Sequence, residues 1–72
     1  MNTVNSLRIS ASIRAYRRKN SMSQTSFGEL FGVSPQAVSK WERELSCPDI
    51  ILLPEIARVL GVSIAYLLGA EG

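Results

Sequence analysis

The sequence predicts an all-α protein, a compact domain of five short helices, from three observations. Three segments repeat the order apolar residue, serine, three residues, apolar residue, which is typical of helix starts. A glycine follows several segments with helical spacing, which is typical of helix ends. The first long segment carries apolar residues at the spacing of one helical face.

The first helix is expected over residues 8–19. Its apolar residues Ile9, Ile13 and Tyr16 follow at i, i+4 and i+7, so they should form one buried stripe.

The second, third and fifth helices are expected to begin at Gln24, Pro35 and Ile64. Each follows a serine whose hydroxyl can accept from a free N–H group of the first turn. The apolar residues on either side of each start should pack together as a hydrophobic staple. These pairs are Met22 with Phe27, Val33 with Val38, and Val62 with Leu67.

The helix ends and the fourth helix follow from glycine and proline. Gly32, Gly61 and Gly69 are expected just beyond helices that end at Phe31, Leu60 and Leu68. The fourth helix should begin near Ile51, because Pro54 is tolerated only in a first turn. Residues 43–49 are expected to form a loop, and residues 1–6 and 70–72 loops or frayed ends.

Composition argues against catalysis. The 72 residues contain no histidine, and the six acidic residues are spread along the chain. The sequence therefore offers no nucleophile–base pair and indicates neither a metal nor a cofactor. A single cysteine, Cys47, fits a reducing cytoplasm. No apolar run approaches the roughly 18 residues of a membrane span, and the length suits one domain over residues 1–72.

The charge is distributed unevenly. Residues 1–28 carry five basic side chains and no acidic one, whereas residues 29–72 carry three basic against six acidic ones. This pattern favours a partner that is a polyanion, although a solvated basic helix would give the same pattern.

The central pair of helices carries the functional argument. Two short helices joined by a Gly-Val-Ser turn form the helix-turn-helix arrangement, which also occurs as a plain corner of small bundles. In the second of them, Val38 and Trp41 form an inner face. The outer face carries Gln36, Lys40 and Arg43, for which the fold alone gives no reason.

Taken together, these motifs resemble the Cro/lambda-repressor-type helix-turn-helix family, also called the XRE family. The resemblance covers about residues 8–69, the expected ordered core. It rests on the following residues: Arg17, Ser-Gln at 23–24, Gly28, Gly-Val-Ser at 32–34, Trp-Glu at 41–42, Pro48 and Leu-Gly-Val-Ser at 60–63. It implies a lambda-repressor-like fold whose third helix lies in the major groove of DNA.

The resemblance also implies roles for individual residues. Gln24 would bind a phosphate, and Arg43, just past the third helix, would bind another. Arg17 would pair with Glu42 to tie the first helix to the third, and would also lie near the DNA backbone. The residues expected to contact DNA from the recognition helix are Ser34, Pro35, Gln36, Ser39 and Lys40.

Several positions depart from the family pattern, among them Leu30 and Ile51, which are apolar where the family is usually polar. Pro35 stands where relatives present a polar side chain, so its contact with a base could only be apolar. Gly28 stands where alanine is usual, which permits close packing but costs about 1 kcal/mol in a helix interior. Glu44 replaces a common glycine and would be strained if the backbone has positive φ there.

The function predicted is sequence-specific regulation of transcription, as a repressor that binds a palindromic site on double-stranded DNA as a homodimer. The expected dimer surface comprises Ile51, Tyr66 and Leu68. The alternative is a protein-interaction module on the same fold, such as a toxin-neutralising antitoxin or an adaptor, which would use Leu30, Ile51 and the last two helices. We expect a cytoplasmic protein of bacterial or phage type with no membrane partner, and a further protein partner remains open.

Overall fold

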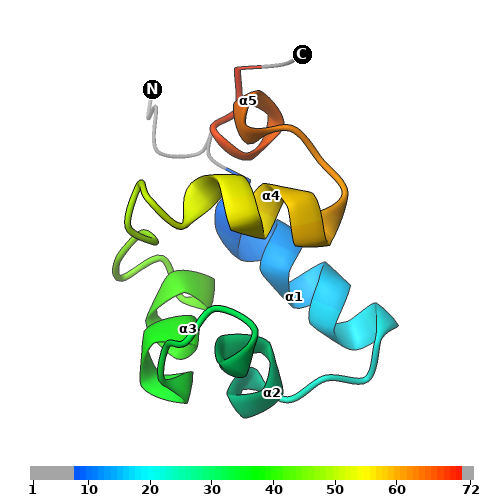
Figure 1. Cartoon of the computed structure of the whole chain (residues 1–72), viewed down its shortest axis with the longest axis vertical. Helices are drawn as coiled ribbons and strands as arrows, with labels where there is room; N and C mark the ends of the chain where they lie inside the picture. Colours follow the sequence, from blue (N-terminus) through cyan, green and yellow to red (C-terminus); the bar gives the residue numbers. More distant parts are fainter. Residues whose placement is uncertain (1–7, 71–72) are drawn as a thin grey trace.

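The computed structural model describes residues 8–70 and contains five α-helices (Figure 1). They are α1 (Ile9–Lys19), α2 (Gln24–Glu29), α3 (Pro35–Glu42), α4 (Leu53–Leu60) and α5 (Ile64–Leu67). α1 crosses the middle of the molecule, with α4 and α5 at one end and α2 and α3 at the other. Residues 8–70 contain no strand, so the prediction of an all-α fold is confirmed.

Serines cap three of the helix starts, as the repeated pattern predicted. The hydroxyls of Ser23, Ser34 and Ser63 accept from backbone N–H groups of the first turn at 3.0, 3.2 and 2.9 Å. In each staple, the apolar residue inside the helix is fully buried and the one before the serine packs against the core. The starts at Gln24, Pro35 and Ile64 are therefore confirmed.

All five helices end in the same way, with a residue in the left-handed region. The next residue donates its N–H to the carbonyl five positions back, at 2.9–3.0 Å in every case, which satisfies a free carbonyl of the last turn. The left-handed residues are Ser21, Gly32, Glu44, Gly61 and Gly69. The three glycines were predicted as stops. Ser21 was not predicted as a stop. Glu44 has a φ of 63°, so it adopts the positive φ for which the sequence analysis expected strain at this position.

Two helix boundaries differ from the prediction by two residues, and the start of α1 and the end of α5 differ from it by one. The helix expected from Ile51 begins at Leu53, because Asp49 holds a turn before it. Its carbonyl accepts from Leu52 N–H at 2.8 Å, and its carboxylate accepts from Ile51 N–H at 3.1 Å. The helix expected to reach Phe31 ends at Glu29, because Phe31 N–H donates to the carbonyl three residues back instead of four.

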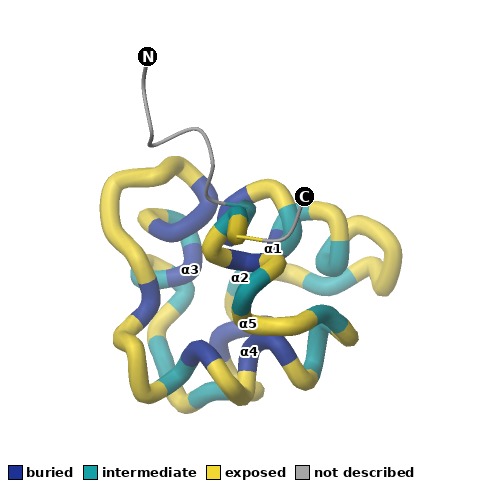
Figure 2. Tube along the Cα trace, turned by 90° about the horizontal axis from the view of Figure 1, so that it is seen from above, coloured by how far each residue is buried: buried dark blue, intermediate teal, exposed yellow. Residues whose placement is uncertain are grey.

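The core receives one fully buried side chain from each helix, and the buried segments turn toward a shared interior (Figure 2). These residues are Ile13, Phe27, Val38, Ile56 and Leu67. Burying such a side chain contributes about 1.5–3 kcal/mol. Because every helix contributes one, no single helix can leave without opening the core.

Gly28 allows α2 to pack closely against the turn that follows it. A Cβ atom at this position would lie 2.5 Å from the backbone oxygen of Val33, well inside contact distance. The N–H of Val33 also donates to the carbonyl of Gly28 at 3.0 Å. The departure from alanine thus accompanies a tight junction between α2 and the start of α3.

Candidate nucleic-acid interface

α3 has an anchored inner face and an open outer face. Val38 and Trp41 are 0% and 5% exposed, so Trp41 belongs to the core. Gln36 and Lys40, four residues apart, are exposed on the other side. Ser34 is also exposed at the start of the helix, while Pro35 and Ser39 are half-buried.

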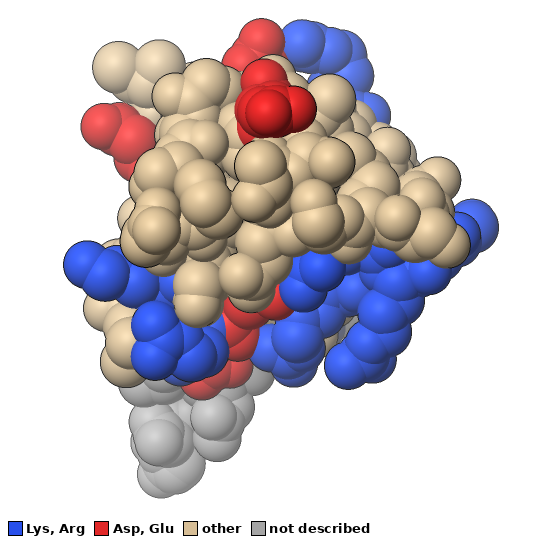
Figure 3. Space-filling view, turned by 90° about the horizontal axis from the view of Figure 1, so that it is seen from below, with Lys and Arg blue, Asp and Glu red and all other residues tan. Residues whose placement is uncertain are grey.

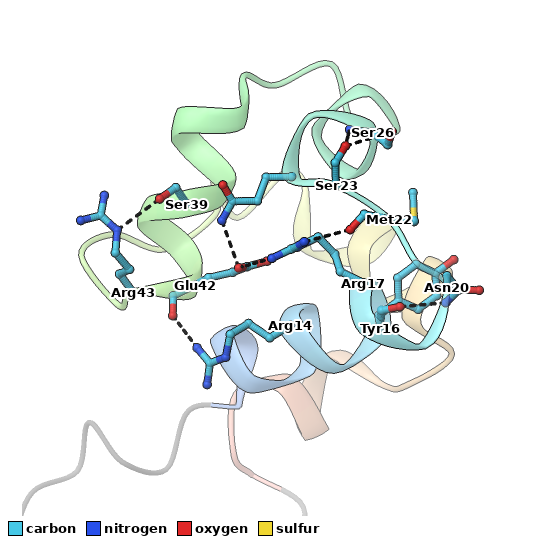
Figure 4. A network of polar contacts seen from close by, with 11 residues as sticks. Arg14, Tyr16, Arg17, Asn20, Met22, Ser23, Ser26, Ser39, Glu42 and Arg43 are labelled. Carbon is cyan, nitrogen blue, oxygen red and sulfur yellow. Dashed lines mark hydrogen bonds and ion pairs between the residues drawn. The ribbon is translucent and has the colours of Figure 1, made fainter.

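The C-terminal turn of α3 presents a guanidinium to the outside. Arg43 is exposed, and its Nε donates to the hydroxyl of Ser39 at 3.2 Å (Figure 4). This bond holds the Arg43 side chain along α3, next to the outer face that carries Lys40.

A buried ion pair between Arg17 and Glu42 ties α3 to α1, as the resemblance implied. Nε and Nη2 of Arg17 donate to the two carboxylate oxygens of Glu42 at 2.5 and 2.8 Å. A third donor, Nη1, reaches the carbonyl of Met22 at 2.9 Å. The Glu42 side chain is only 5% exposed, so this pair lies between the helices rather than on the surface (Figure 4).

The surroundings of this pair favour its charged form. Burial by itself would raise the pKa of Glu42, but hydrogen bonds from Arg17 and Gln24 and the charges of Arg17 and Arg14 outweigh burial, so the pKa lies below its ordinary value. The hydrogen bond to Glu42 raises the pKa of Arg17 against a smaller opposing effect of burial.

Gln24 makes a different contact from the one the resemblance implied. Its side-chain amide donates to the Glu42 carboxylate at 3.2 Å, so it joins α2 to the ion pair between α1 and α3. Arg17 is likewise directed inward, with its side chain 21% exposed. In the described structure both residues brace the helices, and their contacts with phosphate remain predictions.

Two further contacts between α1 and the end of α3 were missed in the sequence. Nη1 of Arg14 donates to the main-chain carbonyl of Glu42 at 2.6 Å. The hydroxyl of Ser10 donates to the carboxylate of Glu44 at 3.0 Å. The sequence did contain a signal, because each of these residues directly follows a member of the apolar stripe of α1. Ser10, Arg14 and Arg17 therefore share one face of the helix, beside that stripe.

Basic groups flank the end of the molecule formed by α2 and α3. Viewed from that end, most Lys and Arg side chains extend along the lower side of a mainly uncharged surface, with acidic groups among them (Figure 3). Lys40 and Arg43 are exposed at the end of α3, and Arg18 and Lys19 at the end of α1. Such exposed basic charge suits a polyanion.

The residues expected at a dimer surface are exposed but differ in their surroundings. Ile51 is 80% exposed in the loop between α3 and α4, beside Ile50 at 77%. Tyr66 and Leu68 are 37% and 42% exposed. The guanidinium of Arg8 lies 4.7 Å from the centre of the Tyr66 ring, so part of this ring is engaged within the chain.

Neither a membrane-spanning helix nor a metal site is found in the described part of the chain. No helix within residues 8–70 has the length and apolar character needed to cross a bilayer. Over the same residues, no group of three or more His, Cys, Asp or Glu side chains is arranged to hold a metal ion.

Comparison with known proteins agrees with this geometry. A family model described as helix-turn-helix, of the Cro/C1 type, matches residues 13–67, which include most of α1 and all of α2 to α5. Comparisons with curated proteins and with solved structures found no match. The family match covers more than half of the chain, and α2, the turn and α3 lie within it. The chain therefore belongs to the Cro/C1-type helix-turn-helix family, the XRE family, of DNA-binding regulators.

Proposed function

We propose that the protein recognises a specific sequence of double-stranded DNA by inserting α3 into the major groove. The observation that carries this proposal is the division of α3 into two faces. Gln36 and Lys40 are exposed on one side, while Val38, Trp41 and Glu42 fix the other side to the bundle. A helix held on one side and open on the other can enter a groove without unfolding its support.

The outer face carries side chains suited to reading bases. A glutamine amide can pair with N6 and N7 of adenine, and a lysine can donate to O6 and N7 of guanine. We assign these roles to Gln36 and Lys40, with Ser34, Pro35 and Ser39 as neighbouring contacts. Arg43, at the end of the same helix, is suited to a phosphate, which positions the protein without specifying sequence.

We further propose that two copies act together on a palindromic site, as a repressor that occludes a promoter. α3 has eight residues, so one copy can read only a few base pairs. Two recognition helices about one turn of DNA apart would supply the rest. The exposed side chains of Ile50 and Ile51, with Tyr66 and Leu68 on the α5 side, supply apolar surface for the contact between copies.

Selection of bound sites from a random DNA pool tests this proposal directly. We expect an enriched sequence made of two inverted half-sites about 10 base pairs apart from centre to centre. Affinity for that sequence and for random DNA should then be measured against salt, where phosphate contacts give a steep negative slope. Enrichment of a single half-site would reject the dimer, and absence of any enrichment would reject sequence-specific recognition.

A second function is favoured by one observation, the exposure of several large apolar side chains. Leu30 is 49% exposed, and Leu45, Ile50 and Ile51 are 63%, 77% and 80% exposed. An antitoxin-like or adaptor module would use such residues to bind another protein. Flat salt dependence, with no affinity for DNA at low salt, would favour this function over DNA binding.

A further inference from the structure

The end of the recognition helix is held by a row of polar side chains on α1. Ser10, Arg14 and Arg17 follow at i, i+4 and i+7, so they share one face of the helix. All three contact the last turn of α3 or the residues just after it. Figure 4 shows the contacts of Arg14 and Arg17 with Glu42. The ion pair of Arg17 is therefore one contact of three, spaced along the length of α1.

Arg14 differs from its neighbours because it binds the backbone of α3. Its Nη1 lies 2.6 Å from the carbonyl oxygen of Glu42, the last residue of the helix. The last carbonyls of a helix have no partner within it. Those of Ser39, Lys40 and Trp41 accept from backbone N–H groups of residues 43–45. Arg14 supplies the donor for the carbonyl that follows them.

This contact is also electrostatically favourable. The C-terminus of a helix carries a partial negative charge, and a guanidinium beside it stabilises that end. A bond to the backbone acts directly on the axis of α3, whereas the bond to the Glu42 carboxylate acts through that side chain. Together, the backbone contact of Arg14 and the side-chain contact of Arg17 restrain both the position and the tilt of the helix.

We propose that Arg14 is a positioning residue for DNA recognition: it sets the angle at which α3 meets the groove and does not itself contact DNA. This inference rests on the proposed sequence-specific binding. Base contacts need side-chain atoms placed to within a fraction of an ångström. Random DNA is held through phosphates and tolerates a tilted helix. Loss of Arg14 should therefore affect specific binding much more than non-specific binding.

The test compares Arg14→Met with Arg18→Met. Both variants remove one positive charge from α1, but Arg18 is exposed and Arg14 is bound to α3. On the selected site, Arg14→Met should bind about tenfold more weakly than Arg18→Met. On random DNA the two should bind equally, with the same salt slope. Arg14→Lys keeps a cationic donor, so it should recover part of the loss.

Two results would overturn the proposal. Equal losses on both DNAs, with a salt slope shallower by about 0.9, would mean that Arg14 binds a phosphate directly. A loss on the selected site no larger than that of Arg18→Met would mean that Arg14 contributes only charge.

A measurement without DNA separates this inference from the proposed function. Residual dipolar couplings of backbone amides report the angle between α3 and α1 in the free protein. We expect this angle to differ from wild type in Arg14→Met and to lie closer to the wild-type value in Arg14→Lys, which keeps a cationic donor. An unchanged angle in Arg14→Met would overturn the positioning role even if wild-type protein had no preferred DNA site.

Discussion

Replacing Glu42 by alanine is the most direct test of how the recognition helix is held. The change removes both carboxylate oxygens from Arg17 and one acceptor from Gln24. It leaves a guanidinium that is only 21% exposed and keeps one bond, to the carbonyl of Met22. The helices α1, α2 and α3 then lose the polar contact that joins all three.

The expected loss of stability in Glu42→Ala follows from this geometry. Removing one partner of a buried ion pair costs about 3–5 kcal/mol, because the other charge remains without its partner. Arg17 keeps partial access to water and one hydrogen bond. The loss of stability should therefore lie at the lower end of this range, about 3 kcal/mol. For a domain of this size, such a loss lowers the melting temperature by about 12–24 °C.

The assay is thermal unfolding followed by circular dichroism, with a matched control in the same chain. Glu55 pairs with Arg58 at 3.5 Å, but their side chains are 51% and 71% exposed. Glu55→Ala should therefore change the stability by less than about 0.5 kcal/mol. A double-mutant cycle with Arg17→Met should give a coupling energy between Arg17 and Glu42. Equal melting temperatures for Glu42→Ala and Glu55→Ala, or a coupling near zero, would refute the reasoning.

The same carboxylate makes stability depend on pH in a defined direction. The pKa of Glu42 is lowered in the folded state, so its contribution is complete above the unfolded value of about 4.3 and is lost as pH falls through the lower folded value. Between about pH 5 and pH 3, wild type should lose more free energy of unfolding than Glu42→Gln does. Urea titrations at each pH measure this difference, and parallel losses in the two proteins would contradict it.

The remaining predictions concern packing, backbone strain and base reading. Gly28→Ala should destabilise the protein by about 1–3 kcal/mol in urea unfolding, because its Cβ would collide with the Val33 carbonyl; a gain in stability, as at an unhindered helix position, would contradict this. Glu44→Gly should be about 1 kcal/mol more stable than Glu44→Ala, since both lose the bond from Ser10 and only glycine relieves the φ of 63°; equal stabilities would show that the left-handed backbone carries no strain. Gln36→Ala should weaken binding to the selected site by about 1–3 kcal/mol in fluorescence titrations and leave random DNA unaffected; equal losses on both would mean that Gln36 reads no base.

Most of the fold could be predicted because its helix boundaries are set locally. A serine cap, a staple and a terminal glycine each act within about six residues, so the sequence alone reveals them. The stops at Ser21 and Glu44 could not be found in this way. Their left-handed conformation is held by the same backbone bonds as at the glycines, and neither side chain favours it. The late start of α4 was missed because a turn held by Asp49 precedes it.

The candidate site was predicted only in part, for a different reason. Exposure of Gln36 and Lys40 follows from helical spacing relative to Val38 and Trp41, which is local information. The inward contact of Gln24 depends on how α2 and α3 cross, and the contact of Arg14 depends on where α3 ends relative to α1. A main-chain acceptor has no residue type of its own, so the position of Arg14 beside the apolar stripe of α1 was the signal available, and it does not identify the acceptor.

The arrangement separates the support of α3 from its outer surface. Polar side chains on other helices, those of Arg14, Arg17 and Gln24, all bind the same residue of α3, Glu42. These four residues form a polar brace for α3. Because Gln36 and Lys40 take no part in the brace or in the core, substitutions there remove no supporting contact. Surface substitutions of this kind change stability by no more than about 0.5 kcal/mol. Under the proposed function, substitutions at Gln36 and Lys40 should therefore alter the preference for a DNA sequence with little change in stability, whereas substitution of Glu42 should lower stability and remove contacts that hold α3.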